Sequence, residues 1–381
     1  MKRKGLALIL ALVIVFASFP LNLSAEGQTA SGQDSNFKDM NNHWAVNVVK
    51  RWVEKGFISG YDDKTFKPDR NITRAEFALL INKVFGYQVK AKEEFSDVKS
   101  TDWFHDAVSK VRNAGVITGY NNSFSPNSPI TRQDAAVIAA KAFELAGTDN
   151  SKVKGFKDSV DVKEYAYNYI SALALKGYLK GFEDNTIRPL KNLTRAETVA
   201  LLDNITGEIL NKKGQYTPKT LKGNLVINTG DVTLKDTSVK GDLYLTEGIG
   251  EGNVTFDNVT VEGNTYIKGG GTHSVVFKNS RLASVFVQKK NSPVRVALEG
   301  NTTAVSVNLT NKAKIEVSEG TKISIVKIEK SAEGTDISGK GTLESIEVKA
   351  KDVLINNKKA EENVIYKVEA GDVEVKPSPT S

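Results

Sequence analysis

Apolar residues recur along this chain with two different spacings, and the change between them falls near Leu210. Before it, apolar positions lie three and four residues apart, as in the runs 44–53 and 104–111, which is the spacing of amphipathic helices. After it, short Val, Ile, Leu and Thr segments alternate with Gly, Asn and Asp, which is typical of short strands between turns. We therefore expect a multidomain protein with an all-α-dominated N-terminal part and an all-β C-terminal part.

The helical part is one unit repeated three times, over residues 37–83, 95–141 and 156–205. Each copy opens on Phe-x-Asp, continues through an aromatic helix and a Gly-aromatic turn, and closes on a second helix that begins at Thr-Arg. A glycine follows each first helix, where a left-handed residue would end it: Gly56, Gly115 and Gly177. Such repetition indicates that one unit cannot complete its core alone, so we expect function at the seams between units.

The start of each second helix has a recognisable cap. Thr73 with Glu76 and Thr194 with Glu197 have the spacing of a capping box, in which side chain and backbone bond reciprocally. Thr131 is followed at the same distance by Asp134, whose side chain is shorter. The box accounts for the Thr and the acid in each repeat, but not for the Arg between them.

Arg74, Arg132 and Arg195 occupy the first helical position, where the helix dipole disfavours a cation by roughly 0.3–1 kcal/mol at an exposed site. Two explanations are open. The guanidinium and the free N–H groups of the helix start could together bind a carboxylate or phosphate. Alternatively, each Arg could pair with an acid of a neighbouring repeat for assembly. If the Arg is exposed, Arg74→Ala should leave the melting temperature nearly unchanged.

The C-terminal part has a repeat of its own. Gly230 and Gly241 open segments that recur at Gly252 and Gly263, an offset of 22 residues. Two or three very short strands in such a period predict a parallel β-helix, with a β-sandwich as the alternative. The alignment stacks Asp236 over Asn258 and Asn279 as a turn ladder, and places Asp257 beside Lys235 and Lys278 on a salt-bridged exterior.

Targeting signals and composition narrow the setting. Residues 2–4 are basic, an apolar stretch covers 6–19, and small residues stand at Ser24 and Ala25, so we expect a secretory signal peptide cleaved after Ala25 and no membrane segment in the mature chain. The chain has no Cys, which excludes disulfides and thiolate sites. Of the formal charge of +7, three charges lie in residues 2–4, and the rest are mixed with acids, which argues against nucleic acid as a partner.

Catalytic and metal-binding patterns are missing from the sequence. The three His (His43, His105 and His273) form no metal-ligand spacing, and neither a phosphate loop nor a nucleophile elbow occurs, so we expect no cofactor, no metal and no catalytic residue. Because parallel β-helices also carry polysaccharide lyases and glycosidases, an enzyme acting on polysaccharide is the alternative for the C-terminal part.

The motifs His43-Trp44-Ala45, Gly60-Tyr61-Asp62-x-x-Thr65-Phe66-x-Pro68 and Ile72-Thr73-Arg74-Ala75-Glu76-Phe77 resemble the S-layer homology (SLH) family, over residues 37 to about 210. The resemblance implies a pseudo-threefold helical module with a ligand groove at each junction. It also implies non-covalent attachment to secondary cell-wall polysaccharide linked to peptidoglycan, typically bearing a pyruvylated amino sugar. We therefore expect a secreted protein held at the cell wall or S-layer, in which the β part is a structural, display or self-association module.

The resemblance also implies the site residues. They are the ligand arginines Arg74, Arg132 and Arg195, the helix starts Thr73, Thr131 and Thr194, the groove aromatics Trp44 and Trp103, the turn glycines Gly60, Gly119 and Gly181, and the opening acids Asp39, Asp97 and Asp158. The second repeat departs from the pattern with Gln133-Asp134 and a turn one residue shorter, and the third has Tyr165 in place of Trp. An aromatic on an amphipathic helix is often a core residue, so a buried position for Trp44 and Trp103 is the alternative.

These observations divide the chain into a signal peptide (1–25), a linker (26–36), three SLH repeats (37–93, 94–154 and 155–210), a polar hinge (211–220), a β-helix-like domain (221–375) and a tail (376–381).

Overall fold

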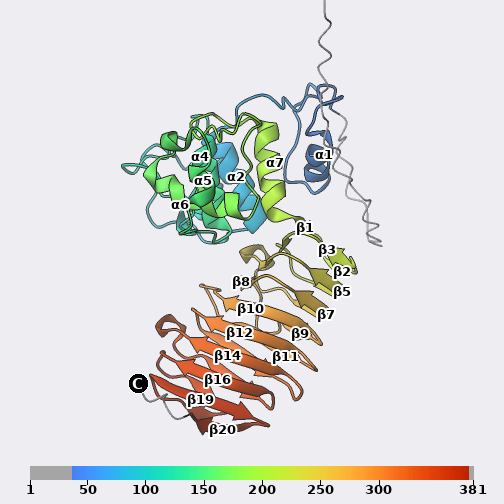
Figure 1. Ribbon diagram of the computed structural model, residues 1–381, viewed down its shortest axis with the longest axis vertical. Helices are drawn as coiled ribbons and strands as arrows, with labels where there is room; N and C mark the ends of the chain where they lie inside the picture. Colours follow the sequence, from blue (N-terminus) through green and yellow to red (C-terminus); the bar gives the residue numbers. More distant parts are fainter. Residues whose placement is uncertain (1–36, 377–381) are drawn as a thin grey trace, which may run out of the picture.

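The computed structural model describes residues 37–376, so the predicted signal peptide, the linker and residues 377–381 lie outside the described part. Figure 1 shows a helical body from which a long stack of strands extends. The first helices of the three repeats are α1 (Val46–Glu54), α3 (His105–Asn113) and α6 (Glu164–Leu175), and the second helices are α2 (Arg74–Phe85), α4 (Arg132–Ala142) and α7 (Arg195–Thr206). A short helix α5 (Ser151–Lys154) and a 3₁₀ turn (Ser159–Asp161) precede α6.

The three repeats close into a ring. Helix α2 packs against α3, α4 against α6 and α7 against α1, so each second helix contacts the first helix of the next repeat. At the centre, the N–H of Ile72 donates to the carbonyl of Leu193 (3.0 Å), that of Leu193 to Ile130 (3.0 Å), and that of Ile130 to Ile72 (3.1 Å). This closed triangle of hydrogen bonds confirms the pseudo-threefold module and explains why one repeat cannot satisfy its own backbone.

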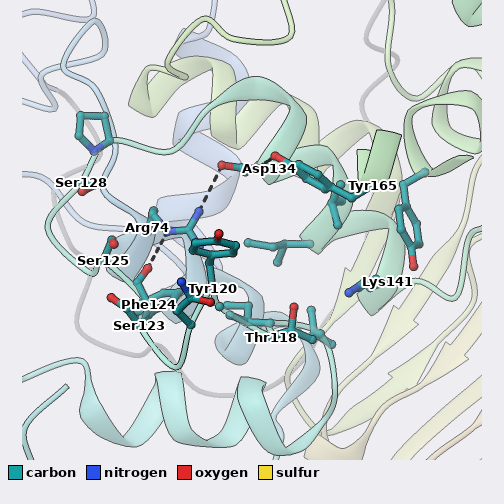
Figure 2. A pocket seen from close by; sticks show the side chains of 18 residues that line it. Arg74, Thr118, Tyr120, Ser123, Phe124, Ser125, Ser128, Asp134, Lys141 and Tyr165 are labelled. Atoms are coloured by element: carbon teal, nitrogen blue, oxygen red, sulfur yellow. Dashed lines mark hydrogen bonds and ion pairs between the residues drawn. The ribbon is translucent and has the colours of Figure 1, made fainter. Parts of the chain in front are cut away.

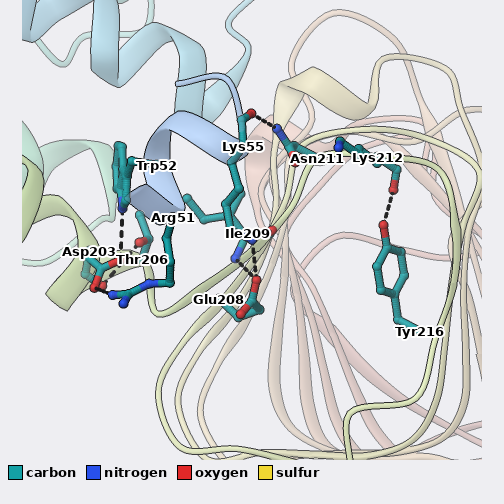
Figure 3. A network of polar contacts seen from close by, with 10 residues as sticks. All are labelled: Arg51, Trp52, Lys55, Asp203, Thr206, Glu208, Ile209, Asn211, Lys212 and Tyr216. Atoms are coloured by element: carbon teal, nitrogen blue, oxygen red, sulfur yellow. Dashed lines mark hydrogen bonds and ion pairs between the residues drawn. The ribbon is translucent and has the colours of Figure 1, made fainter. Parts of the chain in front are cut away.

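The first helices bury the face that their spacing predicts. Val49, Trp52 and Val53 of α1 are buried, and Gly56, Gly115 and Gly177 follow the helices with φ of 77°, 79° and 74°, as predicted for left-handed ends. The ring is closed by α1 and α7: Arg51 Nη2 and Trp52 Nε1 donate to the two carboxylate oxygens of Asp203, at 2.7 and 2.9 Å (Figure 3).

The C-terminal part is a parallel β-solenoid. Its strands stack in register with the 22-residue offset that the sequence predicts, as in Val232 beside Val254 and Leu243 beside Thr265. The β-sandwich alternative is wrong, because the pairing through the stack is parallel. The strands are β1 (Glu208–Leu210), β2 (Gly214–Tyr216), β3 (Thr220–Leu221), β4 (Leu225–Ile227), β5 (Val232–Val239), β6 (Leu243–Leu245), β7 (Val254–Val261), β8 (Thr265–Ile267), β9 (Val276–Lys278), β10 (Arg281–Val287), β11 (Val294–Glu299), β12 (Thr303–Leu309), β13 (Ala313–Val317), β14 (Lys322–Ile328), β15 (Asp336–Gly339), β16 (Thr342–Val348), β17 (Leu354–Ile355), β18 (Lys358–Lys359), β19 (Val364–Glu369) and β20 (Asp372–Val375).

The far end of the solenoid changes pairing direction. Strand β19 runs antiparallel to both β16 and β20, and β18 runs antiparallel to β17. These strands end the parallel stack, so the last complete coil does not present an unpaired edge of the same geometry to solvent.

The predicted turn ladder is present. Asn258 Nδ2 donates to Asp236 Oδ1 at 2.7 Å, and Asp236, Asn258 and Asn279 all adopt left-handed φ values, of 49°, 56° and 48°. Asp257 lies in register between Lys235 and Lys278, as aligned. Within residues 37–376 it forms no ion pair with either lysine, so the expected salt bridge at this position is not made.

Residues 211–220 are not a hinge in the structure. They contain β2 and the start of β3, and both strands pair with β5. The solenoid begins even earlier, because only Gly207 separates the end of α7 from β1, which pairs with β4. A Cβ at Gly207 would lie 2.3 Å from the carbonyl oxygen of Asn224, so the connection is too tight for any other residue.

The helical body and the solenoid share one core. The cluster of buried residues that fills the repeats continues into Ile209, Val226, Tyr244 and Tyr266 of the first coils. Polar contacts flank it: Lys55 Nζ meets Glu208 Oε1 at 2.5 Å and the carbonyl of Ile209 at 2.7 Å (Figure 3). No helix within residues 37–376 has the length and apolar character needed to cross a bilayer.

Candidate ligand junctions between the repeats

The start of each second helix meets the turn of the next repeat. We call the three meeting places the Arg74, Arg132 and Arg195 junctions, after the first residue of each helix. The backbone N–H of Arg74 donates to the carbonyl of Ser128 (3.0 Å), that of Arg132 to Lys191 (2.8 Å) and that of Arg195 to Arg70 (2.9 Å). Because the next N–H in each helix is also bonded to this turn, the predicted anion receptor of free helix N–H groups is absent, and the guanidinium alone remains for a ligand.

Each guanidinium also binds the neighbouring turn. Arg74 Nε donates to the carbonyl of Phe124 (2.8 Å), Arg132 Nη2 to that of Lys180 (2.9 Å), and Arg195 Nε and Nη2 to those of Phe66 (2.9 Å) and Ser59 (3.0 Å). The arginines are therefore partly buried clamps between repeats. The expectation that Arg74→Ala leaves stability unchanged rested on an exposed cation, and that premise is wrong.

The three arginines differ in their counter-charges. Arg74 Nη1 lies 3.3 Å from Asp134 Oδ2, which is the pairing with a neighbouring repeat's acid that the assembly explanation requires. Within residues 37–376, no carboxylate forms an ion pair with Arg132 or Arg195, and Arg132 Nε is buried without a hydrogen-bond partner. Burial lowers the pKa of both guanidinium groups. Glu197 acts on Arg132, and Glu76 and Asp39 act on Arg195, through longer-range attraction that partly opposes this effect of burial.

The Arg132 junction holds a cavity of about 320 Å³. Trp44 comes from the first repeat and lines it together with Arg132, Phe182 and Glu197. The Trp44 side chain is 64 % exposed, and Trp103 on the second repeat has the same exposure. The alternative that these two residues belong to the core is therefore wrong, and Trp44 is available to a ligand beside Arg132.

The Arg74 junction holds a larger cavity, of about 960 Å³ (Figure 2). Tyr165 lines it from the third repeat, in the place that Trp44 takes at the Arg132 junction. Its hydroxyl donates to Asp134 Oδ1 (2.6 Å) and accepts from Gln133 Nε2 (3.1 Å). The departures of the second and third repeats from the family pattern thus meet at one junction and bond to each other.

The threonines act as helix caps. The hydroxyls of Thr73 and Thr194 accept from the N–H of Glu76 and Glu197, and both glutamates bond back to complete the predicted boxes. Thr131 accepts from the N–H of Asp134, but Asp134 does not reach back, because its side chain is one methylene shorter. Its carboxylate bonds Tyr165 and Arg74 instead.

The opening acids and the turn glycines shape the turns from behind. The carboxylates of Asp39, Asp97 and Asp158 each accept two backbone N–H groups of their own repeat's turn, at 2.8 and 2.7 Å. A Cβ at Gly60, Gly119 or Gly181 would lie 2.1, 2.5 or 2.3 Å from the opening Phe ring of the repeat. These six residues hold the turns that the arginines meet, and none of the acids lines the two cavities described above.

A second set of cations, not predicted from the sequence, lies around two aromatic rings of the turns. Arg188, Arg132 and Lys191 surround the ring of Phe182 at 3.9, 5.0 and 5.7 Å from its centroid. At the Arg195 junction, Lys67, Arg195 and Arg70 surround Tyr61 at 4.1, 5.1 and 5.7 Å. These cations could be found by aligning the first and third repeats on the turn proline. Lys67 and Arg188 directly precede this proline, and Arg70 and Lys191 follow it at the same distance.

Comparison with known proteins agrees with this geometry. The family model of the S-layer homology domain matches residues 36–78, 94–136 and 155–199. The chain is 34 % identical over 154 residues to a cellulosome-anchoring protein of Acetivibrio thermocellus, covering 39 % of this chain and 34 % of that protein. It is 29 % identical over 225 residues to the surface-layer 125 kDa protein of Lysinibacillus sphaericus (58 % and 18 %) and 31 % identical over 173 residues to an amylopullulanase of Thermoanaerobacterium thermosulfurigenes (44 % and 9 %).

The chain thus spans about a third or less of the length of these relatives. The matches to the amylopullulanase and to the cellulosome-anchoring protein have about the length of the three repeats. The chain thus carries three tandem S-layer homology domains followed by a β-solenoid, and its relatives include a cellulosome-anchoring protein and a surface-layer protein.

Proposed function

We propose that the helical module binds secondary cell-wall polysaccharide linked to peptidoglycan, and that it recognises the carboxylate of a pyruvylated amino sugar. The observation that carries this proposal is Arg132, whose guanidinium is partly buried at a cavity, has no paired acid within residues 37–376, and keeps a buried Nε without a partner. A planar guanidinium presents parallel N–H donors that match a carboxylate.

The surroundings of Arg132 suit a sugar acid. Trp44 offers an exposed ring at the wall of the same cavity, against which the apolar face of a pyranose can pack. Arg188 and Lys191 add positive charge around Phe182, partly balanced by Asp184 and Glu197 at 2.9 and 2.8 Å. The Arg195 junction repeats the pattern with Lys67 and Arg70, which strengthens the case for an anionic ligand at two junctions.

The relatives support an anchoring role. One of them is named a cellulosome-anchoring protein and another a surface-layer protein, and their matches to this chain are 154 and 225 residues long. The name amylopullulanase carries no enzymatic activity over to this chain, because the match covers only 9 % of that protein.

For the solenoid we propose a structural or display role. Its cavity of about 270 Å³ is lined by Glu299 and Glu316, the only two carboxylates there, so it is the place to look for a glycosidase. However, a hydrogen bond from Arg295 lowers the pKa of Glu316. Burial opposes this effect, but Lys314 adds to it, and the pKa is about 2. Glu316 therefore cannot act as a general acid at neutral pH, and its ion pairs with Arg295 and Lys314 are typical of a charged outer face, which is why we favour a spacer.

The experiment is a binding measurement with the full chain on immobilised wall polysaccharide. Arg132→Ala and Arg195→Ala should each weaken binding at least tenfold, and the double variant should abolish it. Lys219→Ala in the solenoid serves as a charge-matched control and should bind as the unchanged chain does. Circular dichroism of each variant separates lost binding from unfolding. Unchanged affinity of a folded double variant would exclude the proposal.

A further inference from the structure

The three junctions carry different charges because the second repeat lacks the two cations that flank the turn proline in the first and third repeats. Structural equivalence is shown by the backbone: Lys67, Ser125 and Arg188 each donate their N–H to the opening acid of their repeat at 2.7 Å. Likewise, the carbonyls of Arg70, Ser128 and Lys191 each accept from the first residue of a second helix. The Arg74 junction therefore has two serines where the other two junctions have two cations each.

The Arg74 guanidinium already has a counter-ion, and Lys141, the other cation that lines this cavity, lies with its Nζ 5.7 Å from the centroid of the Tyr169 ring. Asp134 lies 3.3 Å from Arg74 Nη1 and is fixed by the Tyr165 hydroxyl at 2.6 Å, while Arg74 Nε is bonded to the carbonyl of Phe124 (Figure 2). At the other two junctions the equivalent acids, Glu76 and Glu197, complete capping boxes and pair with Arg70 and Lys191. An incoming carboxylate at Arg74 would have to displace Asp134 and would meet its negative charge.

The Arg74 cavity is instead large and aromatic. Its volume of about 960 Å³ exceeds the 320 Å³ at Arg132, in keeping with the short side chains of Ser125 and Ser128. Tyr120, Tyr165 and Tyr169 line it, and Tyr120 is 80 % exposed. Aromatic faces with hydroxyl and amide groups between them bind an uncharged ring by packing and neutral hydrogen bonds.

We propose that the Arg74 junction is a subsite for an uncharged sugar residue, and that Asp134 with Tyr165 excludes the acidic residue, which is left to the Arg132 and Arg195 junctions. This rests on the proposed function and adds a division of labour to it: one polysaccharide with acidic and neutral residues would engage the three junctions by different chemistry.

The test uses two sugars that differ by one pyruvyl ketal, which carries the carboxylate: the methyl glycoside of an N-acetylated amino sugar and its pyruvyl ketal. Each is titrated into the full chain while the backbone amide NMR signals of Tyr61, Tyr120 and Phe182 report on the three turns. The neutral sugar should shift Tyr120, and the ketal should shift Tyr61 and Phe182 but leave Tyr120 unchanged. Tyr120→Ala should weaken neutral-sugar binding at least tenfold without affecting the ketal.

The decisive variant is Asp134→Asn, which removes the charge and keeps the size. It should let the ketal bind at Tyr120 with at least a tenfold gain in affinity, whereas the matched control Glu262→Gln in the solenoid should create no new site. Ketal binding at Tyr120 in the unchanged chain, equal to that at Phe182, would overturn the inference, as would an Asp134→Asn chain that behaves like the original. If the ketal binds at Phe182 and Tyr61 but the neutral sugar binds nowhere, only this inference fails. If neither sugar shifts any of the three signals, the proposed function itself fails.

Discussion

The ring of Phe143, directly after α4, meets the ring of Tyr244 in β6 edge to face, with their centroids 5.0 Å apart. The Tyr244 hydroxyl also donates to the Phe143 carbonyl at 3.3 Å. The row of rings continues to Phe85 in the helical body and to Tyr266 and Phe286 in the solenoid. The direction in which the solenoid leaves the helical body is therefore fixed by packing.

Tyr244→Ala should uncouple the two parts. Loss of a buried aromatic ring lowers the free energy of unfolding by about 3–5 kcal/mol, and here the loss falls on the shared core. Differential scanning calorimetry of the full chain should change from one transition to two, for the helical body and the solenoid. Tyr120→Ala, an exposed tyrosine, should leave the trace unchanged. A single transition in Tyr244→Ala would show that the parts are coupled elsewhere.

Arg132→Lys should separate charge from geometry. The lysine keeps the positive charge but loses the fork and the hydrogen bond to the carbonyl of Lys180, so the free energy of unfolding should fall by about 1–3 kcal/mol. Affinity for the acidic polysaccharide should fall at least tenfold, because an ammonium is a point charge without a bidentate face. Chemical denaturation and surface plasmon resonance measure the two effects. Full affinity with lysine would mean that charge alone is recognised.

Asp97 should make the second turn sensitive to acid. Burial opposes its ionisation, but the N–H groups of Phe124 and Ser125 and the Ser123 hydroxyl outweigh it, so the pKa of Asp97 is lower than usual. A carboxyl with a lowered folded pKa stabilises the fold above its unfolded pKa of about 3.9, and this stability is lost as the pH falls through the folded value.

Asp97→Asn should therefore lower the melting temperature at neutral pH, and its difference from the unchanged chain should shrink below about pH 4. Thermal melts at a series of pH values measure this, with Asp62→Asn as an exposed control. A difference that stays constant down to the acid end would show that the hydrogen bonds do not depend on ionisation.

Asn258 should tolerate glycine but not valine. Its φ of 56° lies in the left-handed region, where a β-branched residue is strained. Asn258→Val should also lose the bond to Asp236 Oδ1, and a fall of about 2 kcal/mol in the free energy of unfolding is expected. Val254→Ala in the same strand is a comparison in which only packing is lost. If Asn258→Val melts like the original, the ladder does not stabilise the coil.

Features governed by short-range rules were predictable from the sequence. The capping boxes at Thr73 and Thr194 follow from spacing and cap chemistry, the left-handed Gly56 from its place after an apolar helix, and the register of Val232 with Val254 from a repeat that stacks on itself. In each case the partner lies within a few residues or one repeat away.

Features that depend on closure of the ring were not predictable. Arg51 meets Asp203 across 152 positions, and only the packing of α1 on α7 reveals it. The same closure decides that Trp44 is exposed at the Arg132 junction and that Tyr165 reaches Asp134. The prediction of a hinge at 211–220 was wrong for another reason. A solenoid turn exposes much of its sequence, so its polar residues resemble those of a linker.

Binding of the secondary polysaccharide by the helical module is what holds the protein at the wall in the proposed function. Its most direct measurement is co-sedimentation of the full chain with purified cell-wall sacculi, before and after the polysaccharide is removed by acid extraction. The full chain is required because Phe143 and Tyr244 join the two parts, and a fragment would expose their contact. We predict binding to intact sacculi, and loss of binding both on stripped sacculi and with the Arg132→Ala, Arg195→Ala double variant. Equal sedimentation with stripped sacculi would contradict the account.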